Sequence, residues 1–284
     1  MFSAETTACE LASRPGLAQG VGVGPLMCYA QGMCLLAIAV EPHPSLRLVV
    51  AANRDEAHDR PALPAHHWDD VLGAMGGRDL RGGGTWLGVR RGFRFAALTN
   101  VRDPAARREG RSRGALPFGF LQSVEVAQTY LHELERAAYP AFNMVVADSS
   151  GVFYGNELSA EAVRLGPGFH SLSNGRYGDA WPKVVRVREA MKPAIMASGD
   201  IDSDALFEML RDEQQAPDDE LPRTGVPIEI ERRLSSPFVR GDTYGTRCST
   251  VVVVDGAGRI TLSERSFAAG GAPAGPPVEL VLEP

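Results

Sequence analysis

The sequence of 284 residues is poor in lysine, in cysteine and in long apolar runs, and each shortage excludes a class of protein. Two of its 29 basic residues are lysines, a bias that we attribute to codon usage. The net charge of −6 disfavours a nucleic-acid-binding protein, which would carry a basic surplus. No apolar run approaches the roughly 20 residues of a membrane-spanning helix, so no span is predicted.

The four cysteines, Cys9, Cys28, Cys34 and Cys248, lack Cys-x-x-Cys spacing, so neither a zinc site nor a redox pair is predicted. A reducing compartment, by default the cytoplasm, is therefore expected. Motifs typical of nucleotide, zinc or calcium sites and of classical serine hydrolases are missing too. His66 and His67 are expected in an exposed loop, and no metal is predicted. The oligomeric state stays open.

Turn-forming residues are plentiful, with 31 glycines and 20 prolines, and they favour short strands. Strand-like segments precede and follow a helical region, in which helices are expected over 124–136, 181–191 and 204–215. Asp202 and Ser203 are suitable caps for the third helix. This order predicts an α+β protein with antiparallel sheets.

The first two strands are expected over 34–40 and 46–52, joined by a five-residue turn. Pairing Val40 with Leu46 would place Cys34 opposite Ala52, so that residues 53–56 emerge beside Cys34. These four residues are Asn-Arg-Asp-Glu, and taken alone they fit a solvated strand end with turn hydrogen bonds.

Residues 1–32 show no sustained periodicity and lack the features of a secretory signal. They are interpreted as a disordered extension or, preferably, as an over-long gene model whose true start is Met33. Residues 33–284 are predicted to form a single domain.

The segment 53–56 resembles the signature of the NRDE family, which includes the eukaryotic transport and Golgi organisation proteins. Further segments are similar to that family and follow its order from residue 33 to about residue 255: Met33-Cys34, Gly83-Gly84-Thr85-Trp86-Leu87-Gly88, Ala96-Ala97-Leu98-Thr99-Asn100, Leu172-Ser173-Asn174 with Trp181-Pro182-Lys183-Val184, and Tyr244-Gly245-Thr246-Arg247. Each piece alone is weak, whereas the combination is highly specific.

The resemblance implies a four-layer αββα sandwich of the N-terminal-nucleophile hydrolase type, close to bile salt hydrolases and penicillin V acylases. The catalytic positions that it implies are Cys34, Asp55, Asn100, Asn174 and Arg247. Substrate binding is assigned to Asn53, Arg54, Trp86 and His170. Bile salt hydrolases place an arginine just before Asn-x-Asp, where this chain has Ala52, and Arg54 stands inside the motif instead.

The implied chemistry begins with removal of Met33, which would make Cys34 the first residue. Its α-amine, with a pKa of about 7.7–8.0, is suited to accept the proton of the thiol. The thiolate would attack a small amide or thioester, and no cofactor is required. Asp55 would orient the ammonium, Asn100 and Asn174 would stabilise the oxyanion, and Arg247 would lower the thiol pKa or bind a substrate carboxylate.

Two other functions remain open. The first is a non-enzymatic protein that binds or traffics haem or acyl lipids as cargo, with His170 as the best-placed axial ligand. The second is an organisational role without ligand chemistry. On general grounds Cys34 also fits a small buried hydrophobe, Trp86 fits packing between layers, and His170 fits an ordinary hydrogen-bonded histidine.

Overall fold

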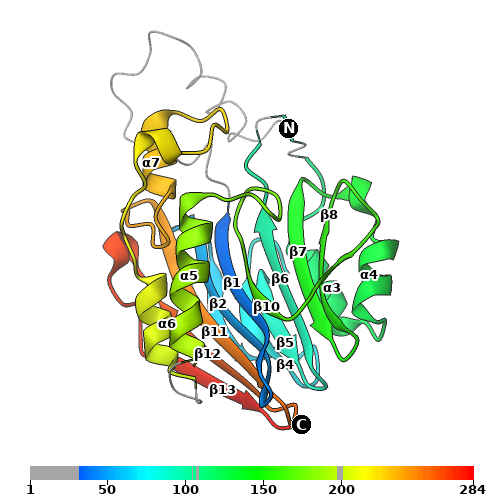
Figure 1. The fold of residues 1–284 in the computed structure, drawn as a ribbon. Helices are drawn as coiled ribbons and strands as arrows, with labels where there is room; N and C mark the ends of the chain where they lie inside the picture. The colour runs from blue at the N-terminus through cyan, green and yellow to red at the C-terminus, as the bar shows by residue number, and fades with distance from the viewer. Residues whose placement is uncertain (1–31, 104, 107–108, 197–200) are drawn as a thin grey trace.

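Two antiparallel sheets pack face to face and carry helices on their outer faces (Figure 1). The computed structural model describes residues 32–103, 105–106, 109–196 and 201–284. The predicted α+β four-layer αββα sandwich with antiparallel sheets is confirmed. The prediction for residues 1–32 lies outside the described residues, apart from Gly32.

The first sheet has six strands and holds both ends of the described chain. Its order is β10 (Gly168–Leu172), β1 (Met33–His43), β2 (Leu46–Ala57), β11 (Tyr244–Asp255), β12 (Ile260–Ser266) and β13 (Val278–Leu282).

The second sheet has seven strands in sequence order. They are β3 (Ala62–His67), β4 (Ala74–Asp79), β5 (Leu87–Arg90), β6 (Arg94–Asn100), β7 (Phe142–Asp148), β8 (Gly151–Asn156) and β9 (Val163–Leu165). His66 and His67 therefore lie on an edge strand, and the expected loop is wrong. Pro64 weakened the strand signal there, although proline is compatible with an edge strand.

Helices α5 (Pro182–Met196) and α6 (Ser203–Leu210) cover the six-stranded sheet, and α3 (Ala115–Gln122) and α4 (Ala127–Glu133) cover the seven-stranded one (Figure 1). Helix α7 (Ile228–Leu234) and three short 3-10 helices, Arg136–Ala138, Asp218–Glu220 and Ala269–Gly271, complete the described chain. Asp202 caps α6 as predicted, because its side chain accepts hydrogen bonds from the amides of Asp204 and Ala205. Among the described helices, none combines the length and the apolar character that a membrane crossing requires.

Side chains of β1 alternate between two cores. Leu36 and Ile38 join the cluster between the sheets, whereas Leu35 and Ala37 pack under α5 and α6. Cys34 follows the first set and therefore points between the sheets.

The predicted register of the first hairpin is wrong by two residues. Val40 pairs with Leu48, and Cys34 pairs with Arg54 instead of Ala52. Strand β1 continues to His43 through a bulge in which Glu41 has a φ of 46°, so the turn is shorter than expected. A shift of two keeps every side chain on its face, so residues 53–56 still lie beside Cys34.

Candidate functional site

The Cys34 side chain is 4% exposed and lies between the two sheets at the start of β1. Arg54 is its partner on β2, and Cys248 of β11 faces the same Arg54 from the other side. Burial raises the pKa of the Cys34 thiol to about 12, and the Arg54 guanidinium and the Asp55 backbone amide oppose this rise. In this chain the thiol is therefore protonated at neutral pH.

Arg54 belongs to an ionic network that crosses from one sheet to the other. Its Nη2 lies 3.8 Å from Glu56 Oε2 and 3.4 Å from Asp79 Oδ2. Arg60 contributes a second guanidinium, with Nε 2.7 Å from the same Asp79 oxygen. The network fixes Arg54 next to the sulfur, where its charge favours a thiolate.

Both predicted carboxamides lie near the start of β1. Nδ2 of Asn174 donates to the carbonyl oxygen of Asn100 at 2.9 Å, and the Ser173 hydroxyl donates to the carbonyl oxygen of Cys34 at 2.8 Å. A Cβ placed on Gly32 would lie 2.6 Å from Nδ2 of Asn100, so this carboxamide touches the chain just before Cys34. The structure thus brings Cys34, Asn100 and Asn174 together.

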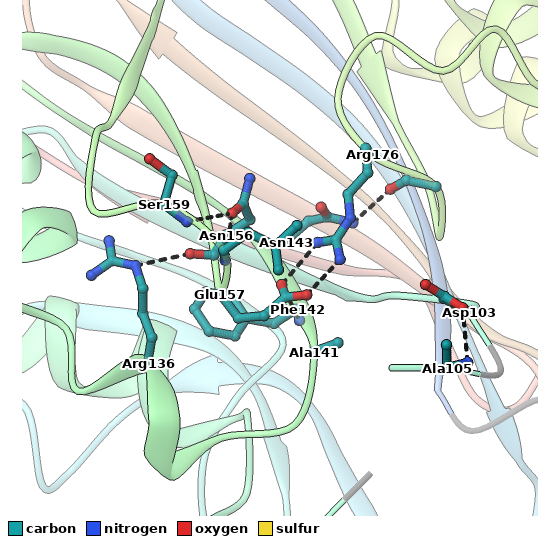
Figure 2. A network of polar contacts seen from close by, with 12 residues as sticks. Asp103, Ala105, Arg136, Ala141, Phe142, Asn143, Asn156, Glu157, Ser159 and Arg176 are labelled. Atoms are coloured by element: carbon teal, nitrogen blue, oxygen red, sulfur yellow. Dashed lines mark hydrogen bonds and ion pairs between the residues drawn. The ribbon is translucent and has the colours of Figure 1, made fainter. Parts of the chain in front are cut away.

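The loop that carries Asn174 is anchored to the second sheet. Asn143 of β7 donates to the carbonyl oxygen of Gly175 at 2.8 Å. Figure 2 shows Arg176 paired with Glu157, whose carboxylate accepts two guanidinium hydrogen bonds. These contacts hold the loop in one conformation and thereby fix the position of Asn174.

Asp55 lies on the opposite face of β2 from Arg54 and points towards the helices. Its register partner is Met33, the residue before Cys34. Oδ1 accepts a hydrogen bond from the Thr246 hydroxyl at 2.6 Å, and Oδ2 has no hydrogen-bond partner. Burial raises the pKa of Asp55 to about 6, and the charge of Lys183 is the main opposing influence.

Lys183 is a residue that the sequence analysis left without a role. It lies in α5, is 1% exposed, and its Nζ has no hydrogen-bond partner. Burial lowers its pKa to about 8, and Asp55 opposes that change. Its spacing of four residues from the buried Val187 could have indicated that it lies on the inner face of the helix.

Arg113 is a second residue that the sequence analysis missed. It donates to the carbonyl oxygen of Ala141 at 3.1 Å. Burial lowers its pKa to about 10, and the charges of Glu56 and Cys34 oppose this change, which places the guanidinium within electrostatic reach of the thiol. Several arginines share the stretch 107–113, so spacing alone could not single it out.

Arg247 is held at the end of β2, and its assigned catalytic role stays a prediction. It is the extra residue of a bulge in β11, because Thr246 pairs with Asp55 while Cys248 pairs with Arg54. Its Nη1 donates to the carbonyl oxygens of Ala57 at 2.7 Å and of Arg60 at 3.1 Å. In this geometry Arg247 braces the end of β2.

Asn53 also has its polar atoms engaged within the fold. Its Nδ2 donates to the carbonyl oxygens of Leu210 at 2.8 Å and Pro237 at 2.9 Å, and its Oδ1 accepts from the Ser249 hydroxyl at 2.5 Å. The side chain ties β2 to the end of α6, and its assigned role in substrate binding stays a prediction.

The other two assigned substrate-binding residues lie outside this polar group. Nδ1 of His170 is 2.8 Å from the Tyr177 hydroxyl, and Nε2 is 2.8 Å from the carbonyl oxygen of Gly166. Trp86 is buried in the core between the sheets. Among the described residues, no group of three His, Cys, Asp or Glu side chains is arranged to hold a metal ion.

A cleft of about 740 Å³ opens beside Asn174. Arg102 and Trp181 line it near the site, and the segment 222–225 forms another wall. Arg102 lies over the Trp181 ring, with its guanidinium carbon 4.6 Å from the ring centre. The cleft therefore connects solvent with the carboxamide side of the site.

Comparisons with known proteins give solved structures as well as sequence relatives. Among the solved structures, the Caenorhabditis elegans N-acylethanolamine-hydrolyzing acid amidase ortholog aligns with a TM-score of 0.42 and 14% identity, over 78% of this chain and 92% of its own. The Transport and Golgi organization protein 2 homolog of Bos taurus is 35% identical over 259 residues, which cover 83% of this chain and 93% of that protein. The corresponding proteins of Homo sapiens and Drosophila melanogaster are 31% and 27% identical, each over 83% of this chain and 93% and 92% of their own.

The family model described as Transport and Golgi organisation 2 matches residues 33–269, which is most of the described chain. The resemblance inferred from the Asn53–Glu56 signature and its companion segments is thereby confirmed. The chain belongs to the Transport and Golgi organisation 2 family.

Proposed function

We propose that this protein hydrolyses or transfers an acyl group of a small amide or thioester, with Cys34 as an N-terminal nucleophile. One observation carries the proposal: the Cys34 thiol, the Arg54 guanidinium and the carboxamides of Asn100 and Asn174 meet at the start of β1. This combination supplies a nucleophile, a cation that favours the thiolate and donors for an oxyanion.

The amine of Cys34 is the proposed base, so the residues before it must first be removed. The freed amine would take the proton of the thiol, and the sulfur would attack the substrate carbonyl. The acyl group then becomes a thioester of Cys34, while the leaving amine or thiol receives the proton. Water or an acceptor nucleophile releases the acyl group and restores the thiol. Asp55 supports this scheme because its open Oδ2 lies on the strand beside Met33.

Asn174 is a suitable oxyanion donor because its carboxamide carries two amide hydrogens, and its Nδ2 is anchored by donation to the carbonyl oxygen of Asn100. Removal of one such donor typically lowers the rate by about 100- to 1,000-fold. The cleft beside Asn174, at about 740 Å³, falls within the usual range for small-molecule sites, roughly 300–1,000 Å³. We therefore expect the substrate to bind there.

The test combines mass spectrometry with acyl probes. Intact mass of the purified protein identifies its first residue, and incubation with p-nitrophenyl acyl esters or acyl thioesters should add one acyl group to the Cys34 peptide. Cys34→Ala should abolish the adduct and the turnover, and Cys248→Ala is the matched control that should retain both. A chain that keeps its leader, together with a Cys34→Ala variant that behaves like the wild type, would contradict the proposal.

Binding of haem or an acyl lipid as cargo is the second candidate, and the size of the cleft is the observation that favours it. Haem titration followed by the Soret band tests it, with His170→Ala and Cys34→Ala as the variants that should weaken binding. Axial ligation by His170 requires loss of its contact with Tyr177 or with Gly166. For either function we expect a reducing compartment such as the cytoplasm, because Cys34 must remain a thiol.

A further inference from the structure

Four charged side chains form a buried cluster on the helix-facing side of the six-stranded sheet. They are Asp55, Arg102, Lys183 and Glu231, and their exposed fractions are 0%, 8%, 1% and 2%. Arg102 and Glu231 form an ion pair, with Nη2 of the arginine 2.8 Å from Oε2 of the glutamate. The remaining two, Asp55 and Lys183, are the strongest charged influences on each other.

The cluster also contains buried polar atoms that make no hydrogen bond. In the described part of the chain, six buried side-chain nitrogen or oxygen atoms lack a hydrogen bond, and four of these belong to the cluster, although one of the four, Oε2 of Glu231, lies in the ion pair with Arg102. They include Nζ of Lys183 and Oδ2 of Asp55. Elsewhere this side of the sheet carries Leu35, Ala37 and Val49 under the helices, and the neutral side chain of Asn53, whose hydrogen bonds are satisfied. Burial of incompletely paired charges is costly, so the cluster differs sharply from its surroundings.

The cluster lies next to Met33, the residue that precedes Cys34. The backbone N–H of Met33 donates to the Tyr244 hydroxyl at 3.0 Å, and that hydroxyl donates to the carbonyl oxygen of Asp55 at 3.2 Å. Nη1 of Arg102 lies 3.6 Å from the sulfur of Met33. Once Met33 is removed, the amine of Cys34 would lie at the edge of this cluster.

We infer that Lys183 is a positioning residue for the amine of Cys34, an inference that rests on the proposed function. Its ammonium group keeps the buried Asp55 carboxylate ionised and at the same time competes for it. The Cys34 amine therefore has the Asp55 carboxylate to orient it. Because this carboxylate is shared with Lys183, the amine can still lose its proton and act as a base.

The charges that face Lys183 support this role. Asp55 comes from β2, Glu231 from α7 and Arg102 from the segment after β6, and the Cys34 thiol acts from the opposite face of β1. Arg102 and Glu231 neutralise each other, so Asp55 is the anion left for Lys183. Burial raises the pKa of Asp55 to about 6, and without Lys183 it would rise further, which favours the neutral form of the carboxylate.

The chain offers a direct measurement, because Lys183 and Lys192 are its two lysines. In protein labelled with [ε-¹³C]lysine, two NMR signals should appear, and Lys192→Arg assigns them. The Lys183 signal should titrate near pH 8, well below the usual lysine value of 10.5. Asp55→Asn should lower the Lys183 midpoint further, because the compensating anion is lost. A Lys183 midpoint at the usual lysine value of 10.5, or no response to Asp55→Asn, would overturn the inference.

The effect on the site is read from the alkylation of Cys34. In mature protein whose first residue is Cys34 by intact mass, the rate of carboxamidomethylation by iodoacetamide is followed against pH at the Cys34 peptide. Lys183→Met should move the rise in rate to higher pH by about one unit or more, since a neighbouring cation is removed. Lys183→Arg should restore much of the profile, and Lys192→Met should match the wild type.

These outcomes separate the two proposals. An unchanged profile in Lys183→Met overturns the role of Lys183 even if acyl transfer is observed. A shifted profile in a protein that forms no acyl adduct supports Lys183 and contradicts the proposed function. A chain that keeps the residues before Cys34 contradicts both. If Lys183→Met does not fold, the titration of Lys183 with and without Asp55 and the Lys183→Arg profile decide the inference.

Discussion

Replacing Lys183 by methionine removes a buried ammonium whose pKa is about 8, against the usual 10.5 of an exposed lysine. Between pH 8 and pH 10.5, Lys183 has lost its proton in the folded protein, whereas it still binds this proton in the unfolded chain. Stability rises with pH wherever the unfolded state binds more protons. Lys183 should therefore contribute an increase in the free energy of unfolding from pH 8 to pH 10.5, which is read as the difference between the wild type and Lys183→Met.

The size of this increase follows from the same two pKa values. Their difference corresponds to about 3 kcal/mol, since each pH unit is worth about 1.4 kcal/mol. Below pH 8 both states hold the proton, so the contribution to the slope disappears. Asp55, whose pKa burial raises to about 6, titrates below this window. Lys183→Met should lack the increase altogether.

The assay is urea denaturation of the full chain at pH 7.5, 9 and 10.5, followed by tryptophan fluorescence, with the free energy extrapolated to water. Lys192→Met serves as the control, because Lys192 is half-exposed and its substitution should leave the pH dependence of the wild type intact. If Lys183→Met and the wild type show parallel curves between pH 8 and 10.5, the reasoning about the buried ammonium is refuted.

Three further substitutions test individual side chains. Asn53→Ala should lower the free energy of unfolding by about 3 kcal/mol in urea titrations, because it leaves two buried carbonyl oxygens unpaired. Arg247→Ala should destabilise by about 1–3 kcal/mol for the same reason and leave the pH dependence of Cys34 alkylation unchanged. Arg113→Ala should slow that alkylation about tenfold at neutral pH, and Arg111→Ala, which removes an exposed ion pair, should not.

The layered fold could be predicted because strand and helix patterns are local. The apolar run at 34–40 and the turn residues after it indicate a hairpin whatever the rest of the chain does. Its register could not be fixed, since the bulge at Glu41 depends on the neighbouring strands. Helix α3 was missed because Pro117 and Gly119 weaken its signal, and packing of Leu116 and Phe120 against the sheet stabilises it instead.

The central part of the site could be predicted for the same reason. Antiparallel pairing of β1 with β2 places residues 53–56 beside Cys34 in any plausible register. Asn174 was placed through the family resemblance, and the structure brings it within hydrogen-bonding distance of Asn100. Arg247 stands in a bulge, which changes the direction of a side chain without changing the sequence spacing, and its assigned catalytic role stays a prediction.

The buried charged cluster at the start of β1 could not be predicted from sequence patterns, because its four residues come from separate parts of the chain. Lys183 and Glu231 lie on helices whose inner faces otherwise read as apolar. A single polar residue on such a face changes the periodicity very little. Only the packing of α5 against β1, and of α7 at the end of β2, shows that these two residues face Asp55 and Arg102.

The location of these charges is itself an argument about function. A fold that needed only stability would be served as well by apolar side chains on this face, since replacing buried ion pairs by hydrophobic residues is often neutral or favourable. The unpartnered atoms of Asp55 and Lys183 instead lie beside the backbone that leads into Cys34. Charges held without full pairing can respond to a new charge nearby, and the freed amine of Cys34 is the group that would bring one. The same buried atoms that weaken the fold are therefore the ones best placed to tune the nucleophile.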